Sequence, residues 1–252
     1  YLSEGALTEE EFLIGFKRAI IKRNLFPVFV ASGLNNIGIT KIMDHIAAYA
    51  PNPFAKIVAN GTVKGAPITR KINDSEATSL FIFKTISEMH IGELSMFKII
   101  SGTLKTGVDL LNSNNGKTER IGQIYCINGK DKQEIAHLHA GDIGTVVKLK
   151  SSKTTDTLCD PRSPITYPKI SFAEPVIQIA IEPKTRGDEE KISVGLQSLT
   201  SEDPTMSWHF DSELKQTILS GHGEFHLVII LQRLKQKFGV DVNQLPPRIP
   251  YR

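Results

Sequence analysis

The sequence predicts a multidomain chain in which an α/β segment is followed by a β-barrel and then by an α+β domain. Two helical patterns flank a short apolar run near the N-terminus, many short strand-like runs follow, and the last third alternates strands with helices. A chain of 252 residues has room for more than one domain, since a domain usually takes roughly 100–200 residues.

The composition is that of an ordinary globular protein, with 40% hydrophobic and 23% charged residues. The net charge of +3 permits a nucleic-acid partner without arguing for one, because 27 acidic residues are mixed among 30 basic ones. Cys126 and Cys159 lack CxxC spacing, so we expect a reducing, cytoplasmic location. No apolar run approaches the roughly 18 residues of a membrane span. The chain lacks an initial Met and stops just after a strand-like run, so we expect both ends to be cuts in a longer protein.

The N-terminal segment reads as the tail of a doubly wound α/β domain. Residues 8–23 form an amphipathic helical pattern that starts with a capping box of Thr8 and Glu11. The apolar run 26–32 predicts a buried strand, and residues 35–49 predict a second helix. About 50 residues cannot complete such a domain, whose usual size is nearer 150.

From about residue 60 to 165, short apolar runs alternate with Gly- and Asn-containing turns, a pattern typical of a β-barrel. The sequence Asn-Asn-Gly at 114–116 predicts a hairpin turn. The last third then follows the order β-α-β-β-α-β, which is the split βαβ, ferredoxin-like arrangement. Its two helices are expected to bury Ile192, Leu196 and Leu199 in the first, and Leu227, Ile230, Leu231, Leu234 and Phe238 in the second.

Two histidines at the start of the last helix raise the question of a metal site. His222 and His226 share one helical face, but the metalloprotease pattern needs glutamate directly after the first histidine, and Gly223 stands there. Gly221 and Gly223 suggest a tight start to the helix, whose N–H groups meet an anion or a neighbouring carboxylate. We favour an ordinary helix start over zinc, and we predict no metal site.

Other candidate residues carry weaker signals. His137 and His139, helped by Asp142, form either a metal pair or, as we favour, a solvated loop edge. Cys126 is expected in the core, and Cys159 is expected to be packed near a turn. The remaining candidates are Trp208, read as core or half-buried, and Arg233, Lys235 and Lys237, read as a solvated helix face or as phosphate contacts.

No GxxxxGK[ST] phosphate loop and no GxSxG motif occurs, so motif chemistry alone favours a binding or structural protein. Several stretches together nevertheless resemble the ribosomal translocase elongation factor G, and they keep its order over nearly the whole chain. They are FPVFVASGLNNIGITKIMDHIAAYAPNP, IISGTLKTGVDLLNSNNGKTERIGQI, TDTLCDP with FAEPVIQIAIEPKT, and DSELKQTILSGHGEFHLVIILQRLKQKFGVDVN.

The resemblance implies the end of a P-loop GTPase domain, the translation-factor barrel called domain II and the ferredoxin-like domain III. The parent would use GTP and Mg to move tRNA and mRNA through the ribosome, with rRNA and ribosomal proteins as partners and no membrane. This chain lacks the phosphate loop and switches, so we expect no catalytic residue, no bound cofactor and no hydrolysis by the chain alone. The implied boundaries are 1–57 for the GTPase tail, 58–165 for domain II, 166–245 for domain III and 246–252 for the start of domain IV.

The resemblance also assigns site residues. Ser32, Gly33 and Leu34 match the last guanine-nucleotide motif, although Gly33 replaces the family's Ala and Asn35 its Lys. The stretch 88–91, which includes Met89, departs from the family's pattern as well.

The same resemblance answers the histidine question. His226 matches a family histidine near the interface between the third domain and the GTPase domain, where Gly221 and Gly223 would also lie. The family has Met in place of His222, so a metal pair is not a family feature. The alternatives are a non-translocating ribosome-binding paralogue, such as a ribosome protection or recycling factor, and a zinc-dependent hydrolase.

Overall fold

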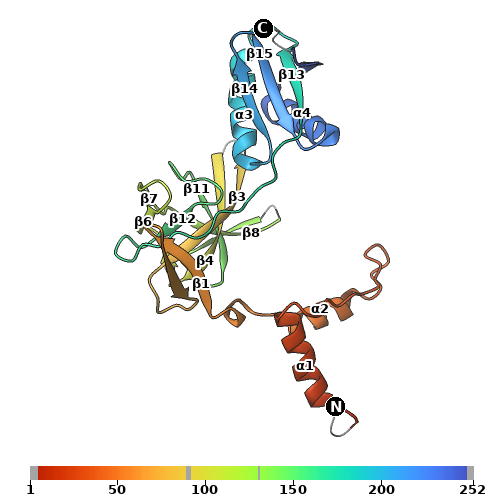
Figure 1. The fold of residues 1–252 in the computed structure, drawn as a ribbon, viewed down its shortest axis with the longest axis vertical. Coiled ribbons are helices and arrows are strands. Elements are labelled where there is room, and N and C mark those ends of the chain that lie inside the picture. The colour runs from red at the N-terminus through yellow and green to blue at the C-terminus, as the bar shows by residue number, and fades with distance from the viewer. Residues whose placement is uncertain (1–4, 89–91, 130, 249–252) are drawn as a thin grey trace. The chain divides into compact units, whose positions relative to one another are not determined.

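The computed structural model describes residues 5–88, 92–129 and 131–248, and the chain divides into two compact units, Tyr1–Ile57 and Val58–Arg252 (Figure 1). Residues 89–91 of the divergent stretch 88–91 lie outside the described residues. In the described part, no helix has the length and apolar character needed to cross a membrane.

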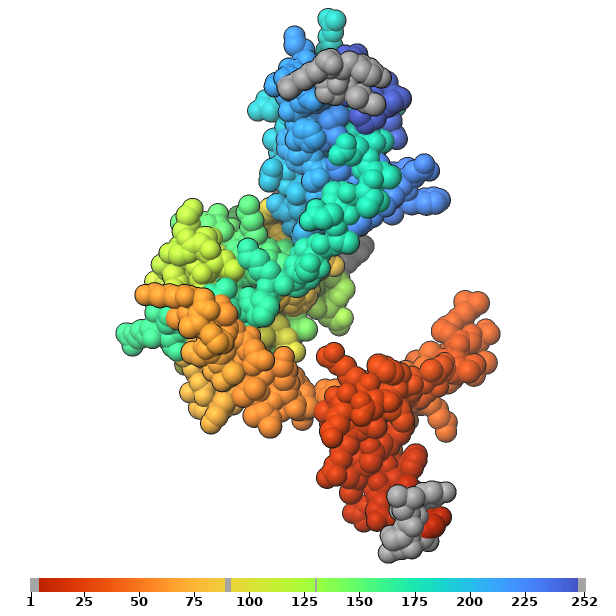
Figure 2. Space-filling model, viewed as in Figure 1, coloured from red at the N-terminus to blue at the C-terminus, as the bar shows by residue number. Residues whose placement is uncertain are grey.

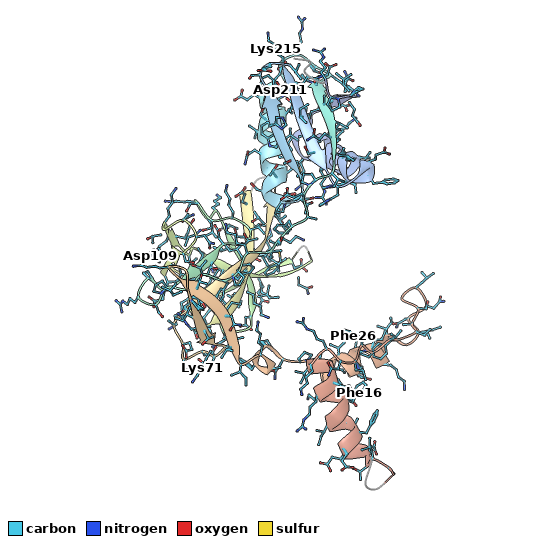
Figure 3. The ribbon with its side chains drawn as sticks, in the orientation of Figure 1. Phe16, Phe26, Lys71, Asp109, Asp211 and Lys215 are labelled. Carbon is cyan, nitrogen blue, oxygen red and sulfur yellow. The ribbon has the colours of Figure 1, made fainter. Side chains whose placement is uncertain are left out.

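The first unit consists of helices α1 (Glu9–Ile21) and α2 (Ile39–Tyr49) and the short 3-10 helix η1 (Pro53–Ala55). The predicted capping box is confirmed, because Glu11 N donates to Thr8 Oγ1 at 3.3 Å and Thr8 N donates to Glu11 Oε2 at 3.0 Å. Phe16 of α1, labelled in Figure 3, packs edge-on against Tyr49 of α2 with ring centroids 5.2 Å apart.

The buried strand predicted at 26–32 is wrong for this chain. Ser32 forms only an isolated bridge with Ile37, and the preceding residues form no strand. Phe26, Val28 and Val30 are 76%, 90% and 97% exposed, and none of the described residues of this unit is buried. A strand needs a neighbour to bind its N–H and C=O groups, and the described residues of this unit supply no sheet for it to join.

The second unit begins with an antiparallel hairpin and an eight-stranded antiparallel sheet that wraps around one apolar core, as expected of the predicted barrel. The sheet order is β7-β6-β12-β3-β4-β11-β8-β9. The strands are β1 (Val58–Val63), β2 (Ala66–Lys71), β3 (Ser79–Glu88), β4 (Gly92–Ser101), β5 (Leu104–Lys105), β6 (Asp109–Asn112), β7 (Thr118–Arg120), β8 (Ile124–Asn128), β9 (Asp131–Ile135), β10 (His137–Leu138), β11 (Ile143–Val147) and β12 (Thr157–Cys159).

The turn predicted at 114–116 is confirmed, since it joins the antiparallel strands β6 and β7 and Gly116 has a φ of 75° that favours glycine. Cys159 is fully buried, as expected. The prediction that Cys126 is a core residue is wrong, because its side chain is exposed. Strand β8 pairs with β11 only at Ile124 and Tyr125, so at Cys126 it has already left the core as a two-stranded ribbon with β9.

The third domain has the predicted β-α-β-β-α-β order, with antiparallel sheet order β14-β15-β13-β16. Its elements are β13 (Ile177–Pro183), α3 (Glu189–Glu202), β14 (Ser207–Asp211), β15 (Gln216–Gly221), α4 (Glu224–Phe238) and β16 (Val242–Leu245). Asp211 and Lys215, labelled in Figure 3, flank the turn between β14 and β15. The predicted helix stripes are confirmed: Ile192, Leu196, Leu199, Leu227, Ile230 and Leu234 are buried, and Leu231, Phe238 and Trp208 pack partly buried against them.

Candidate functional sites

The predicted histidine pair lies where β15 ends and α4 begins. His222 N donates to His226 Nδ1 at 3.1 Å, and the two rings stack with centroids 5.6 Å apart. Because Nδ1 accepts, the proton of a neutral His226 ring sits on Nε2, which donates to Asp203 Oδ2 at 3.0 Å. His226 therefore connects the start of α4 to the residue that ends α3.

This geometry leaves His226 poorly suited to metal binding, because both of its ring nitrogens already have protein partners. Within the described ranges, no group of three or more His, Cys, Asp or Glu side chains is placed to hold a metal ion. Burial raises the pKa of Asp203, but hydrogen bonds from Thr205 and His226 outweigh it and keep that pKa below its ordinary value. The carboxylate thus stays charged as a structural acceptor.

The two glycines that flank His222 have different roles. A Cβ on Gly221 would lie 2.9 Å from Leu227 Cδ2 and 3.1 Å from His226 Nδ1, so β15 and α4 approach here too closely for a side chain. Gly223 has an extended φ of −176° and open space around its Cα. The tight helix start inferred from the sequence therefore depends on Gly221. That these residues face a GTPase domain stays a prediction.

The residues that resemble a guanine-contacting motif, Ser32, Gly33 and Leu34, form a loop closed by two backbone bonds between Ser32 and Ile37, each 3.0 Å long. Ser32 Oγ accepts from Asn35 N at 3.3 Å, and Leu34 is 97% exposed. Among the described residues, the N–H groups of Gly33 and Leu34 have no protein acceptor. The loop thus presents two backbone donors, which is the chemistry that a base carbonyl would need; nucleotide binding here stays a prediction.

The second histidine pair, His137 and His139, lies at an exposed edge of the barrel. The rings meet edge-on at 5.1 Å, and His139 Nδ1 lies 2.8 Å from Asp74 Oδ2. Asp142 does not face the imidazoles together with Asp74, because its Oδ2 accepts the backbone N–H of His139 at 2.8 Å. Asp74 also accepts from Ala140 N at 2.8 Å, so these carboxylates shape a turn.

The three basic residues near the end of α4 are not equally available for phosphate contacts. Lys235 Nζ binds Asp241 at 2.8 Å, and Lys237 Nζ binds Glu202 at 2.5 Å. In the part of the chain that the structure describes, Arg233 has no ion-pair partner and its side chain is exposed. A simple solvated basic face is therefore the wrong description for Lys237, whose partner Glu202 is nearly buried.

A carboxylate in the barrel was missed by sequence reasoning. Glu119 is 1% exposed and lies inside the loop that follows β11. It accepts from Lys150 N at 3.0 Å, Ser151 N at 2.7 Å, Ser151 Oγ at 2.8 Å and Ser152 Oγ at 2.9 Å. Burial raises the Glu119 pKa, but these four donors lower it more, so the pKa lies below its ordinary value. In the sequence, the neighbouring hydroxyl donors of Ser151 and Ser152 were the local feature that could have indicated a bound carboxylate.

Comparisons with known proteins agree with this architecture. Residues 77–161 match the family described as elongation factor G domain 2, and residues 172–245 match Elongation Factor G, domain III. A crystal structure of a protein from Thermus thermophilus is similar over 100% of this chain, with a TM-score of 0.81 and 28% sequence identity. The match covers 36% of that protein, so this chain spans little more than a third of its length.

Proposed function

We propose that this chain, which belongs to the elongation factor G-like translation factors through its second and third domains, is part of a GTPase that drives translocation on the ribosome. The observation that carries this proposal is the order of the two family matches, 77–161 and then 172–245, within one structural match that covers the whole chain. A shared isolated domain would say little about function, whereas two domains in the same order are much more specific.

In this proposal the chain has no catalytic residue of its own. It contains no GxxxxGK[ST] loop, so the phosphates and Mg of a bound GTP would be held by another part of a longer protein. The loop of Ser32, Gly33 and Leu34 would meet the guanine base through its backbone, because the N–H groups of Gly33 and Leu34 have no acceptor among the described residues and Leu34 is exposed. GTP would thus bind next to this chain's N-terminal segment.

The proposed work of the chain is to couple nucleotide state to the ribosome. The barrel would contact small-subunit rRNA. The third domain would transmit movement of the GTPase domain through the region of Gly221, Gly223 and His226. Lysine and arginine side chains would supply much of the RNA affinity through phosphate contacts. Of Arg233, Lys235 and Lys237 on α4, Arg233 is the one with no ion-pair partner among the described residues, and its exposed side chain is available for such a contact.

A second candidate function is that of a ribosome-binding paralogue that does not translocate. Gly33 and Asn35, which replace the family's Ala and Lys in the guanine motif, support this alternative because they would alter the nucleotide contact. Such a factor would act by occupying the ribosome, as protection and recycling factors do. Both candidates require ribosome binding, and they differ in whether GTP turnover follows.

Sedimentation of the chain with purified ribosomes tests the shared part of the proposal. We expect the chain to pellet with ribosomes at about 0.05 M salt and to be released at about 0.5 M, because phosphate contacts weaken steeply with salt. Arg233→Ala should shift the release to lower salt, while Arg186→Ala, which removes an exposed arginine outside α4, serves as the matched control. Failure of the chain to pellet with ribosomes at low salt, or co-sedimentation that does not change with salt concentration, would count against rRNA contact.

A further inference from the structure

The end of barrel strand β3 is held by two charged side chains of the third domain. Ser87 N donates to Glu202 Oε1 of α3 at 2.6 Å, and Ser87 O accepts from Lys237 Nζ of α4 at 3.0 Å. The same Glu202 oxygen accepts from Lys237 at 2.5 Å, so the three residues form a closed ring of hydrogen bonds. We call this ring the β3 latch.

The latch fills a position that the sheet leaves open. Strand β12, the neighbour of β3 on that side, pairs only with Ser79, Leu80 and Phe81. Beyond them the outer edge of β3 has no strand partner among the described residues, and an unpaired, partly buried peptide group costs free energy. Glu202 supplies the missing acceptor and Lys237 the missing donor for Ser87.

The charges of the latch are shielded from water to different degrees. The side chain of Glu202 is 9% exposed and that of Lys237 is 30% exposed. Removing Lys237 would leave the nearly buried charge of Glu202 without compensation, which is unfavourable. The pair is therefore stable as a unit and costly to divide, and Lys237 is the member that solvent ions reach first.

A cavity of about 450 Å³ beside the latch separates the two domains, between the barrel loop 149–154 and the second half of α3. Its hydroxyl groups already have protein partners: Thr154 Oγ1 donates to Thr85, Thr200 Oγ1 to Leu196 O, and Ser201 Oγ to Gln197 O. Because these hydroxyl groups are already hydrogen-bonded within the protein, the lining does not point to a ligand. The barrel and the third domain contact each other mainly through β3 and α3, where the latch lies.

The segment that links the barrel to the third domain adds little restraint on their relative orientation. Residues 168–176 run along the surface as a mostly exposed segment without regular structure, in teal after the barrel in Figure 2. We propose that Glu202 and Lys237 act as a charge-dependent latch that fixes the orientation of the third domain on the barrel, and that loss of either charge releases it. The proposal rests on these contacts and does not depend on the proposed function.

A distance measurement between spin labels tests the latch in the intact chain. The native Cys126 is exposed in the barrel and Cys159 is fully buried, so one added cysteine, Gln232→Cys on the exposed side of α4, completes the pair. With the latch intact, we expect one narrow distance. Glu202→Gln and Lys237→Met should each lose that narrow distance, because each removes one charge and keeps most of the side-chain volume.

Lys235→Met is the matched control, because Lys235 lies on the same helix but pairs with Asp241 inside the third domain. It should keep the narrow distance. Trp208, the one tryptophan of the chain, reports by fluorescence whether the third domain of each variant is folded. A broad distance in the unmutated chain, an unchanged narrow distance in folded Lys237→Met, or equal broadening in Lys235→Met would each overturn the latch.

Discussion

His226 Nε2 lies 3.0 Å from Asp203 Oδ2, and this bond joins the first turn of α4 to the residue directly after α3. The other ring nitrogen accepts the N–H of His222, so the imidazole connects three elements of the third domain: α3, the end of β15 and α4. The histidine that the sequence singled out as a possible metal ligand is thus a structural connector.

Replacing His226 should therefore destabilise the third domain. We expect His226→Ala to lower the free energy of unfolding by about 1–3 kcal/mol, because Asp203 loses a hydrogen-bond donor while still partly buried. His222→Ala is the control and should stay within about 0.5 kcal/mol, since it keeps the backbone N–H that bonds His226 and removes only the stacked ring. Urea unfolding followed by Trp208 fluorescence measures both, and equal losses would contradict the connecting role.

The same geometry predicts no stoichiometric zinc. After dialysis against zinc and removal of free metal, atomic absorption should find far less than one zinc per chain, because both ring nitrogens of His226 are occupied. His222→Ala and His226→Ala should give the same low value as the unmutated chain. One zinc per chain that disappears in both variants would restore the hydrolase alternative.

Gly221 and Gly223 should respond differently to the same substitution. Gly221→Ala places a Cβ 2.9 Å from buried Leu227 and 3.1 Å from His226 Nδ1, so we expect a loss of about 1–3 kcal/mol from overpacking. Gly223→Ala should cost less than about 1 kcal/mol, since its backbone is extended and its surroundings are open. Thermal unfolding monitored by Trp208 compares them, and a larger loss for Gly223→Ala would be the contrary result.

The Glu119 cradle predicts an acid-sensitive barrel. Because the folded pKa of Glu119 lies below its ordinary value of 4.5, its contribution to stability is present above that pH and is lost as pH falls through the folded pKa. Glu119→Gln should be less stable than the unmutated chain at neutral pH, and the difference should shrink in acid. Circular dichroism during urea unfolding at about pH 7 and about pH 3 tests this.

Glu134→Gln is the control for that experiment, since Glu134 lies exposed on β9 and accepts no protein hydrogen bond from a side chain within the described residues. It should match the unmutated chain at both pH values. If the deficit of Glu119→Gln stayed the same in acid, the bound carboxylate would not be the source of its stability.

The sequence predicted correctly those elements that depend on residues close together in the chain. The capping box of Thr8 and Glu11 and the apolar stripe of α4 lie within a few residues, and both formed as expected. The run 26–32 had strand character but depended on a sheet that the described residues of its unit do not supply. Cys126 continued an apolar run, yet its exposure is decided by where β11 stops pairing with β8.

The candidate functional residues likewise differ in whether their contacts are close or distant in the sequence. His222 and His226 were recognisable because they are four residues apart, but the role of His226 comes from Asp203, 23 residues away. Ser87 and Glu202 are 115 residues apart, and no sequence pattern near either residue predicts their hydrogen bond. Lys237 looked like part of a solvated basic face because a helix pattern does not show which neighbouring domain covers it.

The most direct test of the translocase proposal is ribosome-stimulated GTP hydrolysis, measured with the longer protein of which we propose this chain to be part. We expect slow hydrolysis by the protein alone and strong stimulation when ribosomes are added, which is the behaviour of a translation GTPase. Ribosome binding with no stimulated hydrolysis would contradict the translocase proposal and favour the paralogue that works by occupancy.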